Sequence, residues 1–297
     1  MSIHHPIIAV TGSSGAGTSS VKEAFEHMFR RENVNPAVIE GDSFHRYDRA
    51  EMRKAMTQAA ERGNDHFSHF GPEANLFPEL ENLFKTYGET GTGKRRLYLH
   101  NEAEAEAYRH LDLGPGQFTP WEDICADTDL LFYEGLHGCV VTDEVDIARH
   151  VDLKIGVVPV INLEWIQKIH RDTSQRGYSE EAVMDTILRR MHDYVHYIIP
   201  QFAGTDINFQ RVPIVDTSDP IIARDIPTAD ESLVVIRFRY PDKFGVDFPY
   251  LLQMLHDSWL SRRNTIVVPG GKMGLAMELI LTPILGRLLA EEEASKG

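Results

Sequence analysis

Short, uninterrupted apolar segments recur along the chain, and each has the length of a strand buried on both faces of a sheet. They lie at residues 7–10, 37–39, 130–133, 153–158, 212–215, 233–239 and 265–268. Segments with helical spacing of apolar residues separate them, at 21–31, 73–87, 102–110, 162–178, 180–199, 248–260 and 275–289. This alternation, without a linker, predicts one α/β domain over residues 1–297, with a mostly parallel central sheet flanked by helices.

Residues 50–117 interrupt the alternation. They are polar and irregular outside their two predicted helices, and their apolar content is too low for an independent core. We therefore expect this insert to form a flap over a ligand crevice rather than a second domain.

A glycine-rich turn joins the first predicted strand to the first predicted helix. It reads Gly12-Ser13-Ser14-Gly15-Ala16-Gly17-Thr18-Ser19-Ser20, in the strand–loop–helix layout of a phosphate-binding P-loop for ATP. Glycines let consecutive N–H groups turn toward an anion, and the helix N-terminus adds partial positive charge. Thr18 stands where the motif calls for lysine, so part of the phosphate-neutralising charge has to come from elsewhere. The alternative is a turn that binds nothing.

Two acidic residues follow predicted strands. The carboxyl ends of parallel strands face the ligand crevice of an open α/β sheet, so Asp42 and Glu134 are expected near the glycine-rich turn. Glu134 stands where P-loop proteins carry the carboxylate that holds Mg²⁺. The alternatives are a helix N-cap for Asp42 and a chance acid for Glu134. His45 and Arg49 are spaced by one helical turn, which would let both face an anion.

A cluster of cations lies in the helix predicted at 162–178. Lys168, Arg171, Asp172 and Arg176 follow one polar stripe of that helix. Such a stripe in an acidic protein indicates a lid that closes on phosphate and supplies the charge missing from the glycine-rich turn. The alternative is the solvated face of an amphipathic helix.

The composition narrows the class of function. Of the 297 residues, 42% are hydrophobic and 25% are charged, as in an ordinary soluble globular protein. The net charge of −15 argues against nucleic acid as a partner. We expect no membrane contact and a cytoplasmic location, because no signal-peptide core and no apolar run of ~18 residues is evident. Cys125 and Cys139 form no CxxC pair, so a zinc site or disulfide framework is not expected.

Several motifs together resemble those of a known family. They are Gly-Ser-Ser-Gly-Ala-Gly-Thr-Ser at 12–19, Glu-Gly-Asp-Ser-Phe-His-Arg at 40–46, Phe-Tyr-Glu-Gly-Leu-His-Gly at 132–138 and Asn-Leu-Glu-Trp-Ile-Gln-Lys-Ile-His-Arg-Asp at 162–172. With Phe-Gln-Arg-Val-Pro at 209–213 and Ile-Val-Val-Pro-Gly at 266–270, they resemble the bacterial phosphoribulokinases over essentially the whole chain. The lysine-free loop is itself a feature of this branch, and uridine kinases are the nearest related family.

The resemblance implies ATP-dependent phosphorylation of D-ribulose 5-phosphate at O1, giving ribulose 1,5-bisphosphate and ADP in the Calvin cycle. It implies that Asp42 accepts the proton of the attacking hydroxyl, and that Glu134 holds Mg²⁺ with help from the Ser19 hydroxyl. Asp172 would be a second acidic participant. The other implied roles are sugar-phosphate binding by His45, Arg49 and Arg176, and charge neutralisation by Lys168 and Arg171.

The same resemblance implies regulation and assembly. The bacterial branch is activated by NADH, inhibited by AMP and assembled into large homo-oligomers, with an octamer among the expected sizes. Arg237 shares a strand face with Arg239, while Arg31 and Arg262 belong to further arginine doublets. We predict that Arg31, Arg237 and Arg262 bind the effector. Pairing with acids of the protein is the alternative for these arginines.

Two other functions stay open at this point. A uridine kinase would accept a neutral nucleoside and would not need so many arginines on the substrate side. A nucleotide-binding regulator without catalysis would explain the missing lysine, but it would have no reason to keep Asp42 and Glu134 in register.

Overall fold

A computed structural model describes residues 5–13, 18–174, 177–223 and 225–296. Within this part of the chain, an eight-stranded sheet has the order β2-β5-β1-β6-β7-β8-β10-β9. The strands from β2 to β7 in this order are parallel, and β8, β10 and β9 extend the sheet in antiparallel fashion. The bounds are β1 Ile7–Thr11, β2 Pro36–Glu40, β5 Leu130–Gly135, β6 Leu153–Val157, β7 Ile207–Pro213, β8 Ser232–Phe238, β9 Trp259–Arg262 and β10 Thr265–Pro269.

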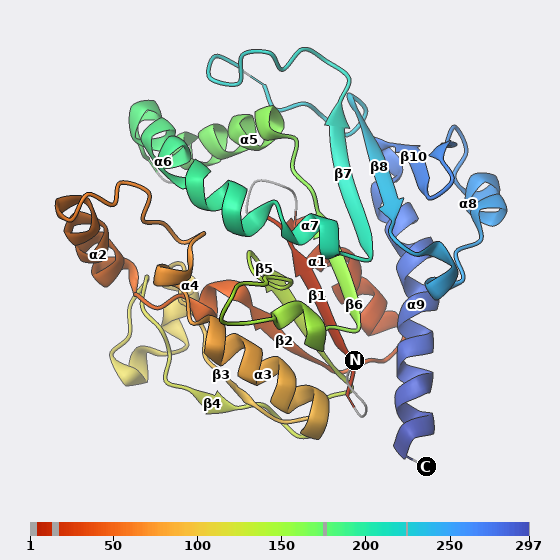
Figure 1. The fold of residues 1–297 in the computed structure, drawn as a ribbon, viewed down its shortest axis with the longest axis horizontal. Coiled ribbons are helices and arrows are strands. Elements are labelled where there is room, and N and C mark those ends of the chain that lie inside the picture. Colours follow the sequence, from red (N-terminus) through yellow and green to blue (C-terminus); the bar gives the residue numbers. More distant parts are fainter. Residues whose placement is uncertain (1–4, 14–17, 175–176, 224, 297) are drawn as a thin grey trace.

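Helices cover both faces of the sheet (Figure 1). Ile8 and Val10 of β1 face the side covered by α1 (Thr18–Arg31), α8 (Phe248–Met254) and α9 (Met273–Lys296). The alternate residues Ile7 and Ala9 face the side covered by α3 (Phe77–Thr90). Because successive side chains of a strand point to opposite faces, burial on both sides explains the uninterrupted apolar runs of the sequence.

Most strands lie where the apolar pattern predicts them, and the predicted α/β class is confirmed. β7 begins five residues before the predicted strand at 212–215. The helix predicted at 248–260 is wrong in its second half, where β9 pairs with β10 instead. Pairing with a sheet edge outweighs the local helical pattern there, and it places Arg262 on a strand.

The predicted flap over 50–117 needs a correction. Its central helix α3 buries Phe77, Leu80 and Phe84 against the sheet, so this segment belongs to the core of the domain. α2 (Arg49–Glu61) packs in a small separate cluster around Met52 and Phe67. The rest of the insert holds α4 (Glu102–Glu106) and β3 (Lys94–Arg95), which pairs in antiparallel fashion with β4 (Glu122–Asp123) just beyond the insert.

The cation-rich segment forms α5 (Ile161–Ser174), which packs against α6 (Glu180–Asp193) through Ile169, Val183 and Ile187. A π-helical turn, Tyr194–Ile198, continues α6 and leads into α7 (Gln201–Gly204). Figure 1 shows α5 and α6 beyond the end of the parallel strands, on the same side of the molecule as α2. The segment predicted as a lid thus forms the first helix of a packed pair, and its closure on phosphate stays a prediction.

The segment Gly270–Glu292, which includes most of helix α9, is long and apolar enough to cross a membrane, judged by length and composition alone. The inward residues Ala276, Met277 and Leu281 are fully buried in the main core, together with residues of α1. An apolar helix that packs into a protein core passes the same test of length and composition, and 33% of this apolar window of α9 is buried in the structure.

Candidate active site

The ends of β1, β2 and β5 bring the predicted acids together. Glu134 of β5 lies in register between Val10 of β1 and Glu40 of β2. The Gly12 N–H, at the start of the glycine-rich turn, donates to the Gly135 carbonyl at 3.1 Å. Asp42 follows β2 directly, in a 3₁₀ turn over Gly41–Phe44. Both acids and the first residues of the glycine-rich turn therefore share one edge of the sheet.

Two glycines set the spacing of this edge. A Cβ on Gly41 would lie 2.5 Å from the Tyr133 hydroxyl and 2.9 Å from the Gly135 Cα. A Cβ on Gly135 would lie 2.7 Å from the Gly41 Cα. The backbones that carry Asp42 and Glu134 are thus in direct contact, and no side chain fits between them.

The Asp42 carboxylate is flanked by two imidazoles. Its oxygens lie 3.6 Å from His45 Nε2 and 3.8 Å from His100 Nε2, and the side chain is 41% exposed. Asp48 supplies the N-cap of α2, with Glu51 completing a capping box. The alternative role of Asp42 as a helix cap is therefore wrong. His100, far away in the sequence, is a site residue that the local pattern did not reveal.

The predicted helical pairing of His45 and Arg49 is also wrong. His45 is extended and buried, forms a bridge with Asn75, and stacks on His69 with ring centroids 4.3 Å apart. α2 begins only at Arg49, whose Nη2 donates to the His100 carbonyl at 2.9 Å. Burial lowers the pKa of His45, and Asp42 opposes this shift only in part. The ring is thus mainly neutral near pH 7.

Arg96 holds the turn that carries Asp42. Its Nε donates to the Ser43 carbonyl at 2.8 Å and its Nη2 to the His45 carbonyl at 2.6 Å. The guanidinium lies 3.7 Å from the centre of the Phe118 ring. Arg96, directly after β3, therefore has a positioning role that the sequence did not indicate.

The cations of α5 are organised by a buried acid. Asp172, only 4% exposed, accepts from Lys168 Nζ at 2.5 Å and from Arg171 Nε at 3.0 Å. Burial alone would raise the pKa of Asp172, but the two cations hold it below its usual value. Burial, reinforced by Arg190, lowers the pKa of Lys168 to about 8. Of the predicted stripe, Lys168, Arg171 and Asp172 form a compact ion-pair cluster rather than a solvated face.

Two further residues near this cluster were missed by sequence reasoning. Arg190 of α6 lies over the Phe70 ring at 5.2 Å and interacts electrostatically with both Asp42 and Asp172. Burial lowers the pKa of Arg190 to about 10. Glu164, in the first turn of α5, is buried and accepts hydrogen bonds from Ser13 and Tyr194. The helical period alone does not show which charged residues of α5 and α6 face inward.

Several predicted residues lie outside the described residues. These are Ser14, Gly15, Ala16 and Gly17 of the glycine-rich turn, and Arg176 of the predicted lid. Thr18, Ser19 and Ser20 are described by their backbone only, which begins α1 directly after the turn, as the P-loop layout requires. The roles assigned to these side chains stay predictions.

The strand ends offer a modest set of metal ligands. No group of three His, Cys, Asp or Glu side chains in the described ranges is arranged to hold a metal on its own. Mg²⁺ in phosphoryl-transfer sites commonly takes one or two protein oxygens and completes its shell with substrate phosphates and water. The half-buried Glu134, beside the glycine-rich turn, fits that requirement.

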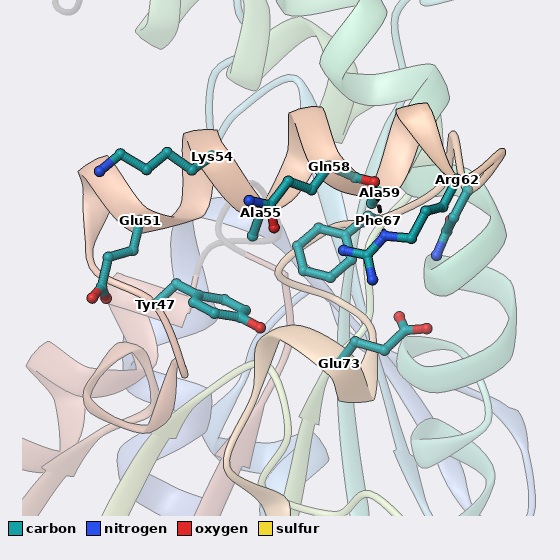
Figure 2. Close-up of a pocket in the computed structure, with 10 residues that line it drawn as sticks. Tyr47, Glu51, Lys54, Ala55, Gln58, Ala59, Arg62, Phe67 and Glu73 are labelled. Carbon is teal, nitrogen blue, oxygen red and sulfur yellow. Dashed lines mark hydrogen bonds between the residues drawn. The ribbon is translucent and has the colours of Figure 1, made fainter.

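A cavity of about 600 Å³ lies beside α2. Figure 2 shows Tyr47, Arg62 and Glu73 pointing into the space beneath the helix, whereas Lys54 points away from it. None of the side chains of Asp42, Glu134 and Lys168 lines this cavity. It is separate from the group of charged residues at the strand ends.

The predicted effector arginines occupy two places. Arg237 of β8 and Arg262 of β9 both pair in register with Thr265 of β10, so they lie in one row across the antiparallel strands. Arg237 Nη2 donates to the Phe202 carbonyl at 2.9 Å. Arg31 instead binds Glu278 of α9 at 2.9 Å. An acid partner, the alternative to an effector, is thus present for Arg31.

Comparisons with known proteins agree with this arrangement. The Phosphoribulokinase / Uridine kinase family matches residues 7–218. A phosphoribulokinase of Nitrobacter vulgaris is 63% identical over 97% of this chain and 98% of its own, and a chromosomal phosphoribulokinase of Cupriavidus necator is 65% identical over 97% of both. The solved structure of a phosphoribulokinase from Rhodobacter spheroides is 59% identical, with a TM-score of 0.89 over 98% of this chain and 100% of that one.

Proposed function

The chain belongs to the phosphoribulokinase / uridine kinase family, and we propose that it transfers the γ-phosphoryl group of ATP to O1 of D-ribulose 5-phosphate. The products are D-ribulose 1,5-bisphosphate and ADP, as in the Calvin cycle. Full-length identity of 59–65% to phosphoribulokinases supports this kinase reaction and its substrate. The observation that carries the mechanism is the Asp42 carboxylate beside the strand end of Glu134, where it interacts electrostatically with Arg190 of α6.

Asp42 acts as the base in this proposal. Its contacts to His45 and His100, at 3.6 and 3.8 Å, are too long for hydrogen bonds. Its oxygens are therefore available to accept the proton of the sugar O1 hydroxyl as that oxygen attacks phosphorus. Arg96 holds the turn that carries Asp42 through its bonds to the Ser43 and His45 carbonyls, and a base has to be positioned in this way to lie within hydrogen-bond reach of the hydroxyl.

The proposed phosphate-binding residues divide into two groups. His45, Arg49 and Arg176 are proposed to bind the phosphate of the sugar, and Lys168 and Arg171 to neutralise the transferring group. Lys168 and Arg171 both contact Asp172, which supports a role of this acid in orienting them rather than in reacting itself. Phosphoryl transfer depends mostly on such positioning and charge neutralisation.

Mg²⁺ is the proposed metal cofactor. Glu134 and the Ser19 hydroxyl would hold it next to the phosphates that the glycine-rich turn binds. When bound, it would neutralise charge on the β- and γ-phosphates. Glu134 contributes by standing in register with the strand that leads into the turn.

Regulation and assembly complete the proposal. We infer activation by NADH through Arg31, Arg237 and Arg262, and assembly into a homo-oligomer in the cytoplasm, without nucleic acid or membrane as a partner. Support comes from the row formed by Arg237 and Arg262 and from the net charge of −15, which disfavours polyanions.

The decisive experiment is an ADP-release assay with the purified protein and Mg²⁺. Ribulose 5-phosphate should support rapid turnover, and uridine should not. Turnover with uridine but not with ribulose 5-phosphate would identify a nucleoside kinase instead. Nucleotide binding without turnover on either acceptor would indicate a regulator.

A further inference from the structure

One buried carboxylate links the glycine-rich turn to the helices of the predicted lid. Glu164 lies in the first turn of α5 and is 9% exposed. Its Oε1 accepts a short hydrogen bond from the Ser13 hydroxyl, and its Oε2 accepts one from the Tyr194 hydroxyl at 3.2 Å. Ser13 directly follows Gly12 in the turn, and Tyr194 starts the π-helical turn after α6. Three segments that are distant in the sequence therefore meet at a single side chain.

We propose that Glu164 is a positioning residue that aligns the ATP-binding turn with the cations that neutralise the transferring phosphoryl group. This inference rests on the proposed kinase function, because it assigns Glu164 a task in that reaction. Glu164, Lys168 and Asp172 follow one another at intervals of four residues on the same face of α5. A helix transmits displacement as a rigid element, so holding Ser13 at one end fixes where Lys168 stands one turn later.

The surroundings of Glu164 fit a fixed link. Burial raises the pKa of Glu164, and Ser13, Tyr194 and Lys168 oppose this shift. Beside it is a cavity of only about 30 Å³, lined among others by Trp165, Lys168 and Arg190. Such a volume holds about one water molecule, so the carboxylate has little room to change partners. The π-helical turn at Tyr194 is a further unusual feature, of a kind frequently found at functional sites.

The test compares Glu164→Ala with Glu164→Gln. Glutamine keeps the shape and can still accept from Ser13, whereas alanine removes the link. For Glu164→Ala we expect kcat/KM for ATP to fall roughly tenfold or more, as for loss of a hydrogen bond to a charged group, with little change in KM for ribulose 5-phosphate. Glu164→Gln should stay within about threefold of the wild type. Glu180→Ala, at an exposed position in the first turn of α6, is the matched control.

A double-mutant cycle with Ser13→Ala locates the effect. If the link acts through Ser13, the Ser13→Ala, Glu164→Ala and double variants should lose about the same factor rather than the product of two factors. Nucleotide affinity is measured directly by Trp165 fluorescence, with Trp165→Phe to remove the signal of that residue. Thermal unfolding of each variant separates loss of the link from loss of the fold.

The outcomes are distinct. Wild-type ATP affinity and turnover in Glu164→Ala, equal losses toward both substrates, or independent effects of Ser13 and Glu164 would each overturn the inference. The binding measurement does not depend on the acceptor. If ribulose 5-phosphate proves not to be the substrate, the proposed function fails, while the cycle on ATP affinity still decides the role of Glu164.

Discussion

The parallel and antiparallel parts of the sheet use charged residues in different ways. In the parallel part, Asp42 follows β2, Glu134 lies at the end of β5, and the cations of α5 follow β6. The proposed catalytic residues therefore lie where strands of one direction end. In the antiparallel part, Arg237 and Arg262 lie along the strands, and Arg237 bonds a backbone carbonyl. Parallel strands place all their following loops on one edge, whereas antiparallel strands alternate. Only the first arrangement concentrates opposing charges.

The largest effect on turnover is expected from Asp42→Asn, in the parallel part of the sheet. The substitution keeps the shape of the side chain and removes the base, so kcat should fall by roughly 10²–10⁴ with little change in ATP affinity. Asp48→Ala is the control, because Asp48 caps α2 and should cost about 1 kcal/mol of stability without a comparable loss of kcat. Near-normal turnover in Asp42→Asn would remove the assignment of Asp42 as base.

Lys168→Met should have the next largest effect, lowering kcat more than ADP affinity. It removes the ion pair between Lys168 and the buried Asp172, so thermal unfolding should be measured beside kinetics. A lysine introduced at Thr18 should add little activity if the α5 cations already supply the charge. Strong activation by Thr18→Lys would contradict that account.

The pH dependence of stability and of kcat/KM for ATP tests the role of Lys168 in a second way. The pKa of Lys168 is lowered to about 8 from 10.5, so the unfolded chain binds this proton more strongly. Folding stability should therefore rise with pH between these values. The cation itself is lost as pH rises through about 8, and kcat/KM for ATP should decline there. Lys168→Arg should shift the decline to higher pH, and an unchanged profile would exclude Lys168 as its cause.

Arg49→Ala tests the substrate side of the parallel part. We expect KM for ribulose 5-phosphate to rise by roughly one to two decades, with ATP parameters little changed. Arg62→Ala, at the other end of α2 and beside the separate cavity, is the control. Equal effects on both substrates would point to damage of the fold, since Arg49 also bonds the backbone at His100.

The smallest effect on turnover is expected in the antiparallel part. Arg237→Ala and Arg262→Ala should leave unactivated turnover within about twofold and weaken activation by NADH. Arg31→Ala should do the same, although its bond to Glu278 makes a loss of stability part of the expected result. If NADH neither binds nor activates the wild-type protein, the effector site is refuted.

Local pattern was sufficient for most of the strands and for the acids at the ends of β2 and β5. Continuous burial forces an apolar run, and topology then places Asp42 and Glu134 at the same edge. It was insufficient wherever a distant contact decides the outcome. His100 reaches Asp42 from the insert, the buried Glu164 accepts hydrogen bonds from the distant Ser13 and Tyr194, and β9 replaces a predicted helix because β10 offers an edge. Those features depend on the assembled fold.

The contact between Gly41 and Gly135 limits how this sequence can change. A methyl group at either position would press against the other backbone or the Tyr133 hydroxyl and push the ends of β2 and β5 apart. Asp42 and Glu134 would move with them. In a randomised library selected for activity, substitutions of these two glycines should be tolerated as poorly as substitutions of the two carboxylates. Neither glycine takes part in the reaction. Only glycine, which carries a hydrogen atom in place of a side chain, lets the two backbones lie this close. The relative position of Asp42 and Glu134 depends on that contact.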